Sequence, residues 1–170
     1  MTKALIFDLD NTLISTDSLK MFRNNREWNK CYSNVHQTKL IFNPNHFNEY
    51  TQIGIVTNSP RPYAIKLLNY HEIHYDCLIA YHDTSYRKPY PEPFLKCLQN
   101  LNTDSANSIS IGDHFNDTIA AKSAGIFSIG VTWGDGTFSQ HQSSNADLII
   151  SNPDSLNTSL INLLNKGESL

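Results

Sequence analysis

The chain has 170 residues, of which 39% are hydrophobic and 17% are charged. This length allows one domain with a real hydrophobic core and makes a second full domain improbable. The net charge of -3 excludes a global attraction to nucleic acid or to an anionic membrane surface. An anionic substrate must therefore be bound by a local group of residues.

The cysteines and the apolar runs give no indication of export. Cys31, Cys77 and Cys97 are odd in number and far apart, which predicts buried thiols rather than disulfides or a zinc site. The apolar run that follows the first residues is too short for a signal peptide, and no run approaches the roughly 20 apolar residues of a membrane span. We therefore expect a cytoplasmic protein with no membrane partner.

The first predicted strand covers residues 4–7 and is followed directly by two carboxylates, Asp8 and Asp10. Side chains at alternate positions of an extended segment project to the same side, so we expect these two to lie close together. Like charges at short range are unfavourable unless a cation intervenes. The pair therefore predicts a bound metal ion.

The segment from about residue 15 to 45 contains no strand-helix unit and is interpreted as an insertion. Its apolar residues Trp28, Cys31, Tyr32 and Val35 have helical spacing and predict one amphipathic helix that packs on the core. Its basic residues would form either a rim for an anionic ligand or a solvated helix surface, and the interleaved acidic residues favour the solvated surface. These basic residues are Lys20, Arg23, Arg26 and Lys30, and the acidic ones are Asp17 and Glu27.

The rest of the chain alternates short apolar strands with helices. Strands are predicted at residues 53–56, 77–80, 108–111, 128–131 and 147–150. Helices are expected to start at Pro62 and at the Pro91-Glu92-Pro93 sequence, to end at Gly125, and to include the leucines from 156 to 164. This alternation predicts an α/β fold with a doubly wound parallel sheet, in a single domain over residues 1–170.

Four of the predicted strands are followed by polar residues of reactive types. In a parallel sheet the carboxyl ends of all strands meet at one edge, so these residues converge. Any one of them is as readily explained as a turn former or helix cap, but together they predict a site. Several carboxylates beside one lysine, with oxygen ligands only, suit Mg²⁺. The set comprises Asp8 and Asp10, Thr57-Asn58-Ser59, Lys88, and Gly112-Asp113 with Asn116 and Asp117; His114 is expected to be a solvent-facing loop residue.

This ordered set resembles the motifs of the haloacid dehalogenase superfamily of phosphatases. The first motif is Asp8-Leu9-Asp10-Asn11-Thr12, the second is Thr57, the third is Lys88, and the fourth is Gly112-Asp113-His114-Phe115-Asn116-Asp117. Three further sequences are similar to the phosphoglycolate phosphatase branch: Lys88-Pro89-Tyr90-Pro91-Glu92-Pro93, Gly130-Val131-Thr132-Trp133-Gly134, and Ala146-Asp147.

The resemblance implies a role for each matched residue. Asp8 would be the nucleophile that becomes an aspartyl-phosphate, and Asp10 the general acid and base. Thr57 and Asn58 would bind phosphoryl oxygens, and Lys88 would neutralise charge. Mg²⁺ would bind a carboxylate oxygen of Asp8, the backbone carbonyl of Asp10, and Asp113, while Asp117 would act through water or by orienting Lys88. Arg61, two residues beyond Ser59, is a modest candidate for substrate contact.

The function that follows is a Mg²⁺-dependent phosphatase acting on a small-molecule phosphomonoester. Many members of the superfamily carry a large helical cap after the first motif, whereas residues 15–45 leave room only for a reduced cap, little more than a helix or a helical hairpin. A reduced cap suits a larger substrate or a site covered by the second subunit of a homodimer. A polynucleotide or phosphoprotein phosphatase with an open site is therefore an alternative, although the acidic balance disfavours nucleic acid. A phospho-accepting receiver module is a further alternative. It is disfavoured because its reactive residues occur in a different order along the chain from those found here.

Overall fold

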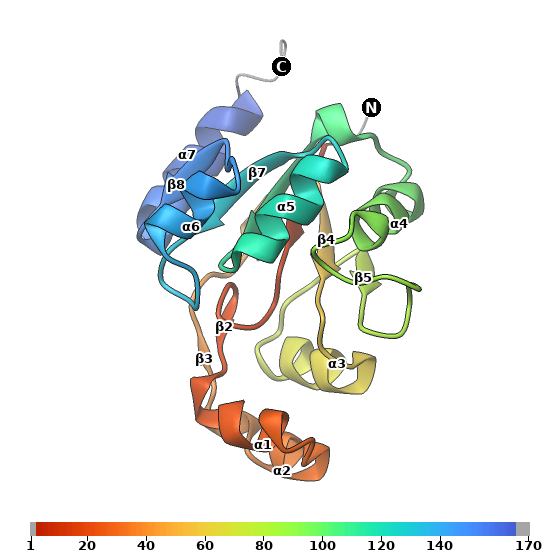
Figure 1. Cartoon of the computed structure of the whole chain (residues 1–170), viewed down its shortest axis with the longest axis vertical. Helices are drawn as coiled ribbons and strands as arrows, with labels where there is room; N and C mark the ends of the chain where they lie inside the picture. The colour runs from red at the N-terminus through yellow and green to blue at the C-terminus, as the bar shows by residue number, and fades with distance from the viewer. Residues whose placement is uncertain (1–2, 166–170) are drawn as a thin grey trace.

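The computed structural model describes residues 3–165 and contains a parallel sheet flanked by helices (Figure 1). The sheet has six strands in the order β5-β4-β1-β6-β7-β8. All six predicted strands are confirmed, with ends that differ by one residue at most. They are β1 (Ala4–Phe7), β4 (Gln52–Val56), β5 (Cys77–Ile79), β6 (Ser108–Gly112), β7 (Phe127–Val131) and β8 (Leu148–Ile150). Residues 1–2 and 166–170 lie outside the described range. The prediction that the chain has no signal peptide concerns a segment that includes Met1 and Thr2.

Four of the helices that follow these strands match the sequence prediction. They are α3 (Arg61–Tyr70), α4 (Glu92–Leu101), α5 (Phe115–Ser123) and α7 (Pro153–Asn165). A further helix, α6 (Phe138–Ser143), was not predicted because its six residues are mostly polar and lack the periodic apolar pattern of an amphipathic helix. It is started instead by a capping box between Thr137 and Gln140.

The two faces of the sheet are covered by different helices, as the alternation along β1 shows. Leu5 and Phe7 lie in the core cluster that includes residues of α3 and α7, whereas Ala4 and Ile6 lie in the cluster that includes α4 and α5. Figure 1 shows α4 and α5 on one face of the sheet. The predicted doubly wound α/β fold is thus confirmed, and the carboxyl ends of β1 and its neighbours β4 and β6 meet at one edge.

The three cysteines are buried and free, as predicted. Their separation in sequence gave no indication that two of them would meet. Cys77 of β5 and Cys97 of α4 are hydrogen-bonded to each other, and this bond is the main cause that lowers the pKa of Cys77 to about 7. No helix among residues 3–165 is long and apolar enough to cross a membrane.

The segment after β1 forms a small structure at the carboxyl edge of the sheet. The short strands β2 (Ile14–Ser15) and β3 (Lys39–Leu40) pair antiparallel, and α1 (Lys20–Asn24) and α2 (Trp28–Ser33) lie between them, below the sheet in Figure 1. Short 3-10 turns complete the segment. The apolar spacing predicted only the helix at α2, because α1 has five residues and few apolar ones. The pair α1 and α2 agrees with the helical hairpin that the length of the segment allowed. Trp28, Tyr32 and Val35 pack against the core, as expected.

Candidate active site

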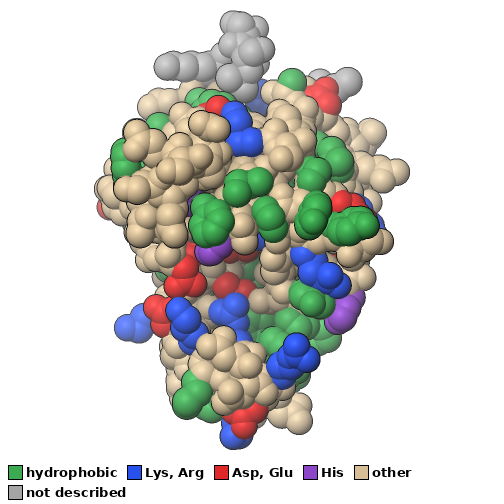
Figure 2. Space-filling view, viewed as in Figure 1, with side chains coloured by type: hydrophobic (Ala, Val, Ile, Leu, Met, Phe, Trp, Pro, Cys, Tyr) green, Lys and Arg blue, Asp and Glu red, His purple; other side chains and the backbone are tan. Residues whose placement is uncertain are grey.

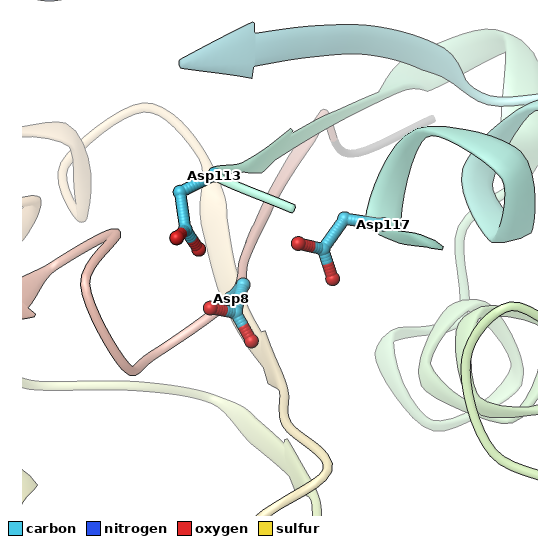
Figure 3. A group of neighbouring side chains, drawn as sticks. All are labelled: Asp8, Asp113 and Asp117. Carbon is cyan, nitrogen blue, oxygen red and sulfur yellow. The ribbon is translucent and has the colours of Figure 1, made fainter. Parts of the chain in front are cut away.

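Three buried aspartates from two strand ends form the centre of the site. Asp8 follows β1, Asp113 follows β6, and Asp117 lies in the first turn of α5. One carboxylate oxygen from each of these residues lies within 4.8 Å of the other two (Figure 3). The backbone N–H of Asp8 still bonds to the carbonyl of Ile111, at 2.9 Å, so the strand ladder itself aligns the first carboxylate with β6. We call these three residues the acidic triad.

Lys88 is the cation of this cluster. Its Nζ lies 2.7 Å from Asp8 Oδ1 and 2.5 Å from Asp117 Oδ1, and it donates to the carbonyl of Val56 at 2.8 Å. Burial alone would lower the pKa of Lys88, but Asp117 and Asp8 raise it above its usual value, so the ammonium stays charged. One positive charge therefore faces three carboxyl groups.

The excess of carboxylates raises the pKa of two of them. Burial, followed by the charges of Asp8 and Asp117, raises the pKa of Asp113 to about 8. The pKa of Asp8 is also raised, first by burial and then by Asp117, although Lys88 opposes this. A hard divalent cation at these oxygens would remove the repulsion, and an oxygen-only donor set fits such an ion. The acidic triad is therefore able to hold a metal.

The loop after β7 holds the side chain of Asp113. Oδ1 accepts from the hydroxyl of Thr12 at 2.9 Å, and Oδ2 accepts from the backbone N–H of Asp135 at 2.7 Å. Gly134 makes this approach possible, because a Cβ at that position would lie 2.2 Å from Asp113 Oδ2. The loop thus fixes the direction in which the carboxylate points.

We expect Gly134→Ala to weaken Mg²⁺ binding by about 10- to 100-fold, because the added methyl group displaces Asp113. Isothermal titration of the folded variant with Mg²⁺ measures this loss directly. Ser139→Ala, an exposed change on the neighbouring helix α6, serves as the control and should bind Mg²⁺ like the unmodified chain. Unchanged affinity in Gly134→Ala would show that the loop does not position the carboxylate.

His141 supports the backbone of the same aspartate and was missed by the sequence analysis. Its side chain is completely buried, and its Nε2 lies 3.0 Å from the carbonyl of Asp113 and 3.1 Å from that of Val131. Because carbonyls accept, Nε2 carries the hydrogen, and Nδ1 then accepts from the hydroxyl of Thr118 at 3.2 Å. Burial lowers the pKa of this histidine, which favours the neutral ring. The capping box that starts its short helix was the signal available in the sequence.

Asp10 does not belong to the acidic triad, although its side chain lines the same cavity as that of Asp8. The extended conformation ends at this point, because a turn covers residues 11–13 and Asn11 has a φ of 60°. The predicted contact of the Asp10 backbone carbonyl with a metal is a separate matter and remains a prediction.

The carboxylate of Asp10 is held by donors from α3, from the loop before α3 and from the segment before α1. It accepts from Ser59 Oγ at 2.6 Å, from Tyr63 Oη at 2.8 Å and from Thr16 Oγ1 at 2.9 Å. Burial and the charge of Asp10 raise the pKa of Tyr63, so its hydroxyl keeps the proton that it donates. Three hydroxyl groups thus fix this side chain at the mouth of the site.

Arg23 of α1 completes this arrangement, and the interpretation of its side chain as part of a solvated surface was wrong. Its Nη1 lies 3.0 Å from Asp10 Oδ1 and donates to Thr16 Oγ1 at 2.8 Å. Its guanidinium also lies over the ring of Tyr63, 5.6 Å from the centroid. Lys20 and Lys30 of the same segment are surface charges, as expected. Lys30 pairs with Glu27, and Lys20 pairs with Asp135.

These groups surround a cavity of about 270 Å³. Thr57 and Asn58 follow β4 and line it, as predicted, and Asn58 Nδ2 donates to the carbonyl of Lys88 at 3.2 Å. His114 also lines the cavity and caps α5 by accepting from Asn116 N–H, so it is not merely a loop residue facing solvent.

Arg61 lies elsewhere, which corrects its prediction as a substrate contact: its Nη2 is bound to Asp83, at 2.5 Å, and to the carbonyl of Leu78.

Comparison with known proteins places this site in a family context. A family model described as haloacid dehalogenase-like hydrolase matches residues 45–131, which include Thr57, Lys88 and Asp113. A phosphoglycolate phosphatase of Salmonella paratyphi A is 37% identical over 84 residues, which are 48% of this chain and 33% of that protein. The phosphoglycolate phosphatase of Escherichia coli K12 is 34% identical over the same length. The match therefore spans about a third of the length of these relatives.

Solved structures with the same fold cover nearly the whole chain. A haloacid dehalogenase-like family hydrolase from Streptococcus pneumoniae has a TM-score of 0.74 at 17% identity, over 94% of this chain and 98% of its own. A hydrolase from Pseudomonas syringae has a TM-score of 0.75 at 19% identity, over 95% and 99%. At this identity the likeness concerns the fold.

Proposed function

The chain belongs to the haloacid dehalogenase-like hydrolase family, and from this premise and the geometry of the site we propose that it is a Mg²⁺-dependent phosphatase. It would hydrolyse a phosphomonoester through an aspartyl-phosphate on Asp8. The observation that carries the proposal is the contact of the buried Lys88 ammonium with Asp8 and Asp117, within an acidic triad beside a cavity of about 270 Å³. A nucleophilic carboxylate, its counter-charge and an oxygen ligand set are thereby combined at one edge of the sheet.

In the first step, a carboxylate oxygen of Asp8 attacks phosphorus and the ester oxygen leaves with a proton from Asp10. In the second step, Asp10 takes a proton from water, whose oxygen attacks phosphorus and releases inorganic phosphate and free Asp8. Lys88 stays charged and offsets the negative charge of the transferring group. A Mg²⁺ ion held by Asp8 and Asp113 would neutralise further charge on the phosphoryl oxygens.

Two further sets of residues have roles that their contacts support. The sequence left two roles open for Asp117, acting through water or orienting Lys88. Its Oδ1 lies 2.5 Å from Lys88 Nζ, which supports the role of orienting Lys88. Thr57 and Asn58 line the cavity beside Asp8 and would bind phosphoryl oxygens. Thr57 and Asn58 follow β4 and Asp117 lies in α5, which follows β6, and these two strands are the neighbours of β1 in the sheet.

Asp10→Asn is expected to affect substrates according to their leaving group. An alkyl oxygen needs a proton to leave, so kcat/KM for an alkyl phosphate should fall by about 10²- to 10⁴-fold. The nitrophenolate of p-nitrophenyl phosphate leaves without one, so its kcat/KM should fall much less. Steady-state assays on both substrates measure the difference, with the exposed change Asp154→Asn as control. Equal losses for both substrates would remove Asp10 from the role of acid.

The helices α1 and α2 would act as the reduced cap of this site. Arg23 of α1 reaches the cavity and pairs with Asp10, which supports a role for this segment at the substrate. A small-molecule phosphate ester is the proposed substrate class, in keeping with the names of the relatives. The receiver-like alternative is disfavoured because the family match covers residues 45–131. A homodimer that covers the site stays a prediction.

A phosphate-release screen tests the proposed function. The substrates are sugar phosphates, phosphoglycolate, nucleotides, phosphopeptides and 3′-phosphorylated oligonucleotides, each with Mg²⁺ and with EDTA. We expect release from at least one small-molecule class in the presence of Mg²⁺ and its loss in EDTA. If no class releases phosphate with Mg²⁺ present, the protein is not a phosphatase. Release from oligonucleotides or phosphopeptides alone would support the open-site alternative instead.

A further inference from the structure

A second groove of about 490 Å³ opens directly beside the catalytic cavity. The two share Arg23, Asn58 and Ser59, so a ligand bound at the phosphoryl site can extend into the groove. Figure 2 shows a hollow between the body of the molecule and the α1–α2 segment, with Lys and Arg side chains near it. The groove is larger than the catalytic cavity of about 270 Å³, which suits a leaving group larger than the phosphoryl group.

The charge of the groove is positive. Arg23 and Arg26 line it together with Trp28, Tyr81 and His82, and its lining includes no carboxylate. Arg23 already has Asp10 as a partner. Arg26 is exposed, and no hydrogen bond or ion pair of its guanidinium is seen within residues 3–165. An unpaired guanidinium beside a groove without acids is suited to bind an anionic group.

The backbone at Arg26 gives a second, independent indication. Arg26 has a φ of 57°, in the left-handed region that Gly and Asn adopt more readily than Arg. The two residues before it are Asn24 and Asn25, so residue types that tolerate this conformation stand next to it while the position itself carries Arg. An arginine at a position that disfavours it supports a function of its side chain.

We propose that this groove binds the leaving group of the substrate and that Arg26 binds a second anionic group on it. The substrate class is then a phosphomonoester with an extended leaving group that carries a carboxylate or a second phosphate. This proposal rests on the proposed phosphatase function and narrows its substrates. Arg26 acts in binding, since nothing brings it to the reacting atoms.

Matched substrate pairs test the proposal. The open-chain compounds glucitol 6-phosphate and 6-phosphogluconate differ by a carboxylate, and fructose 6-phosphate and fructose 1,6-bisphosphate differ by a second phosphate. We expect kcat/KM to favour the member with the extra anion by at least tenfold in one pair or in both, and the pair that shows the preference identifies the anion. Ratios near one in both pairs would overturn the proposal.

Variants at Arg26 separate a binding role from a structural one. Arg26→Gly should cut the preference about tenfold while raising Tm by about 2 °C, because Gly adopts a positive φ without strain. Arg26→Lys should retain most of the preference. Lys30→Gln, which removes a charge that is paired with Glu27 outside the groove, should retain all of it. An unchanged preference in Arg26→Gly would overturn the proposal, whatever the change in Tm.

A binding measurement keeps this result distinct from failure of the phosphatase proposal. Calorimetric titration of the Asp8→Asn variant with 6-phosphogluconate and with glucitol 6-phosphate, and with the fructose pair, needs no turnover. We expect about tenfold tighter binding of the member with the extra anion in the preferred pair, and loss of this difference when Arg26→Gly is added. Equal binding within both pairs would refute the groove proposal even if phosphate release is observed.

Discussion

Replacing Asp8 by Asn is expected to abolish turnover, with a loss of about 10⁴-fold or more in kcat. A carboxamide is a poor nucleophile, and no other described carboxylate of the site is placed to take over both its position and its contact with Lys88. Phosphate release measures the loss. Mass spectrometry of acid-quenched samples should detect an added phosphoryl group on the unmodified protein and none on the variant.

The fold should survive this change, which makes the result interpretable. Asn has nearly the shape of Asp, and Lys88 keeps Asp117 as its charged partner. The pKa of Asp8 is raised by burial and by Asp117, so the neutral side chain also relieves repulsion in the metal-free protein. We expect an unchanged circular dichroism spectrum and a Tm no lower than that of the control Asp154→Asn. Undiminished turnover in a folded Asp8→Asn variant would remove Asp8 from the chemistry.

The fold could be predicted because its strands are short apolar runs and most of its helices have periodic apolar residues. The strands from residue 4 to 7 and from 108 to 111 are fully buried, although the second alternates serine with isoleucine. Their order then brings Asp8, Lys88, Asp113 and Asp117 to one edge of the sheet, whatever the details of the loops. This is why residues far apart in sequence could be grouped from the order of the strands alone.

The remaining features depend on how side chains are directed by irregular backbone. The turn after Asp10 and the short helix α1 determine that Arg23 meets Asp10, and neither has a periodic pattern. Arg61 follows the same strand as Thr57, but Asp83, from the loop after β5, binds its guanidinium away from the cavity. His141 lies in a helix whose six residues are mostly polar. Sequence spacing gives the element on which such residues lie, and the tertiary partner decides where each one points.

The metal-free protein is expected to lose stability as the pH rises from 5 to 8, and Asp113 is the main cause. Burial and two neighbouring carboxylates raise its pKa to about 8 from an ordinary value of 3.8. Between these values the folded protein binds a proton that the unfolded chain does not, so the free energy of unfolding falls with increasing pH until the folded-state pKa is passed. We expect a decrease in Tm on the order of 5 °C over this range in EDTA.

Mg²⁺ should reverse this dependence, because a cation at the acidic triad favours the ionised carboxylates. The rise in Tm on adding Mg²⁺ should therefore be larger at pH 8 than at pH 5, where protons compete for the same oxygens. Asp113→Asn tests the assignment: without a titrating group at this position, most of the pH dependence in EDTA and most of the Mg²⁺-induced stabilisation should disappear. Thermal unfolding at both pH values, with Asp154→Asn as control, gives all of these differences. If Asp113→Asn retained the full response to Mg²⁺, the metal would have to bind outside the acidic triad, and the charge balance proposed for Asp8 and Lys88 would fail with it.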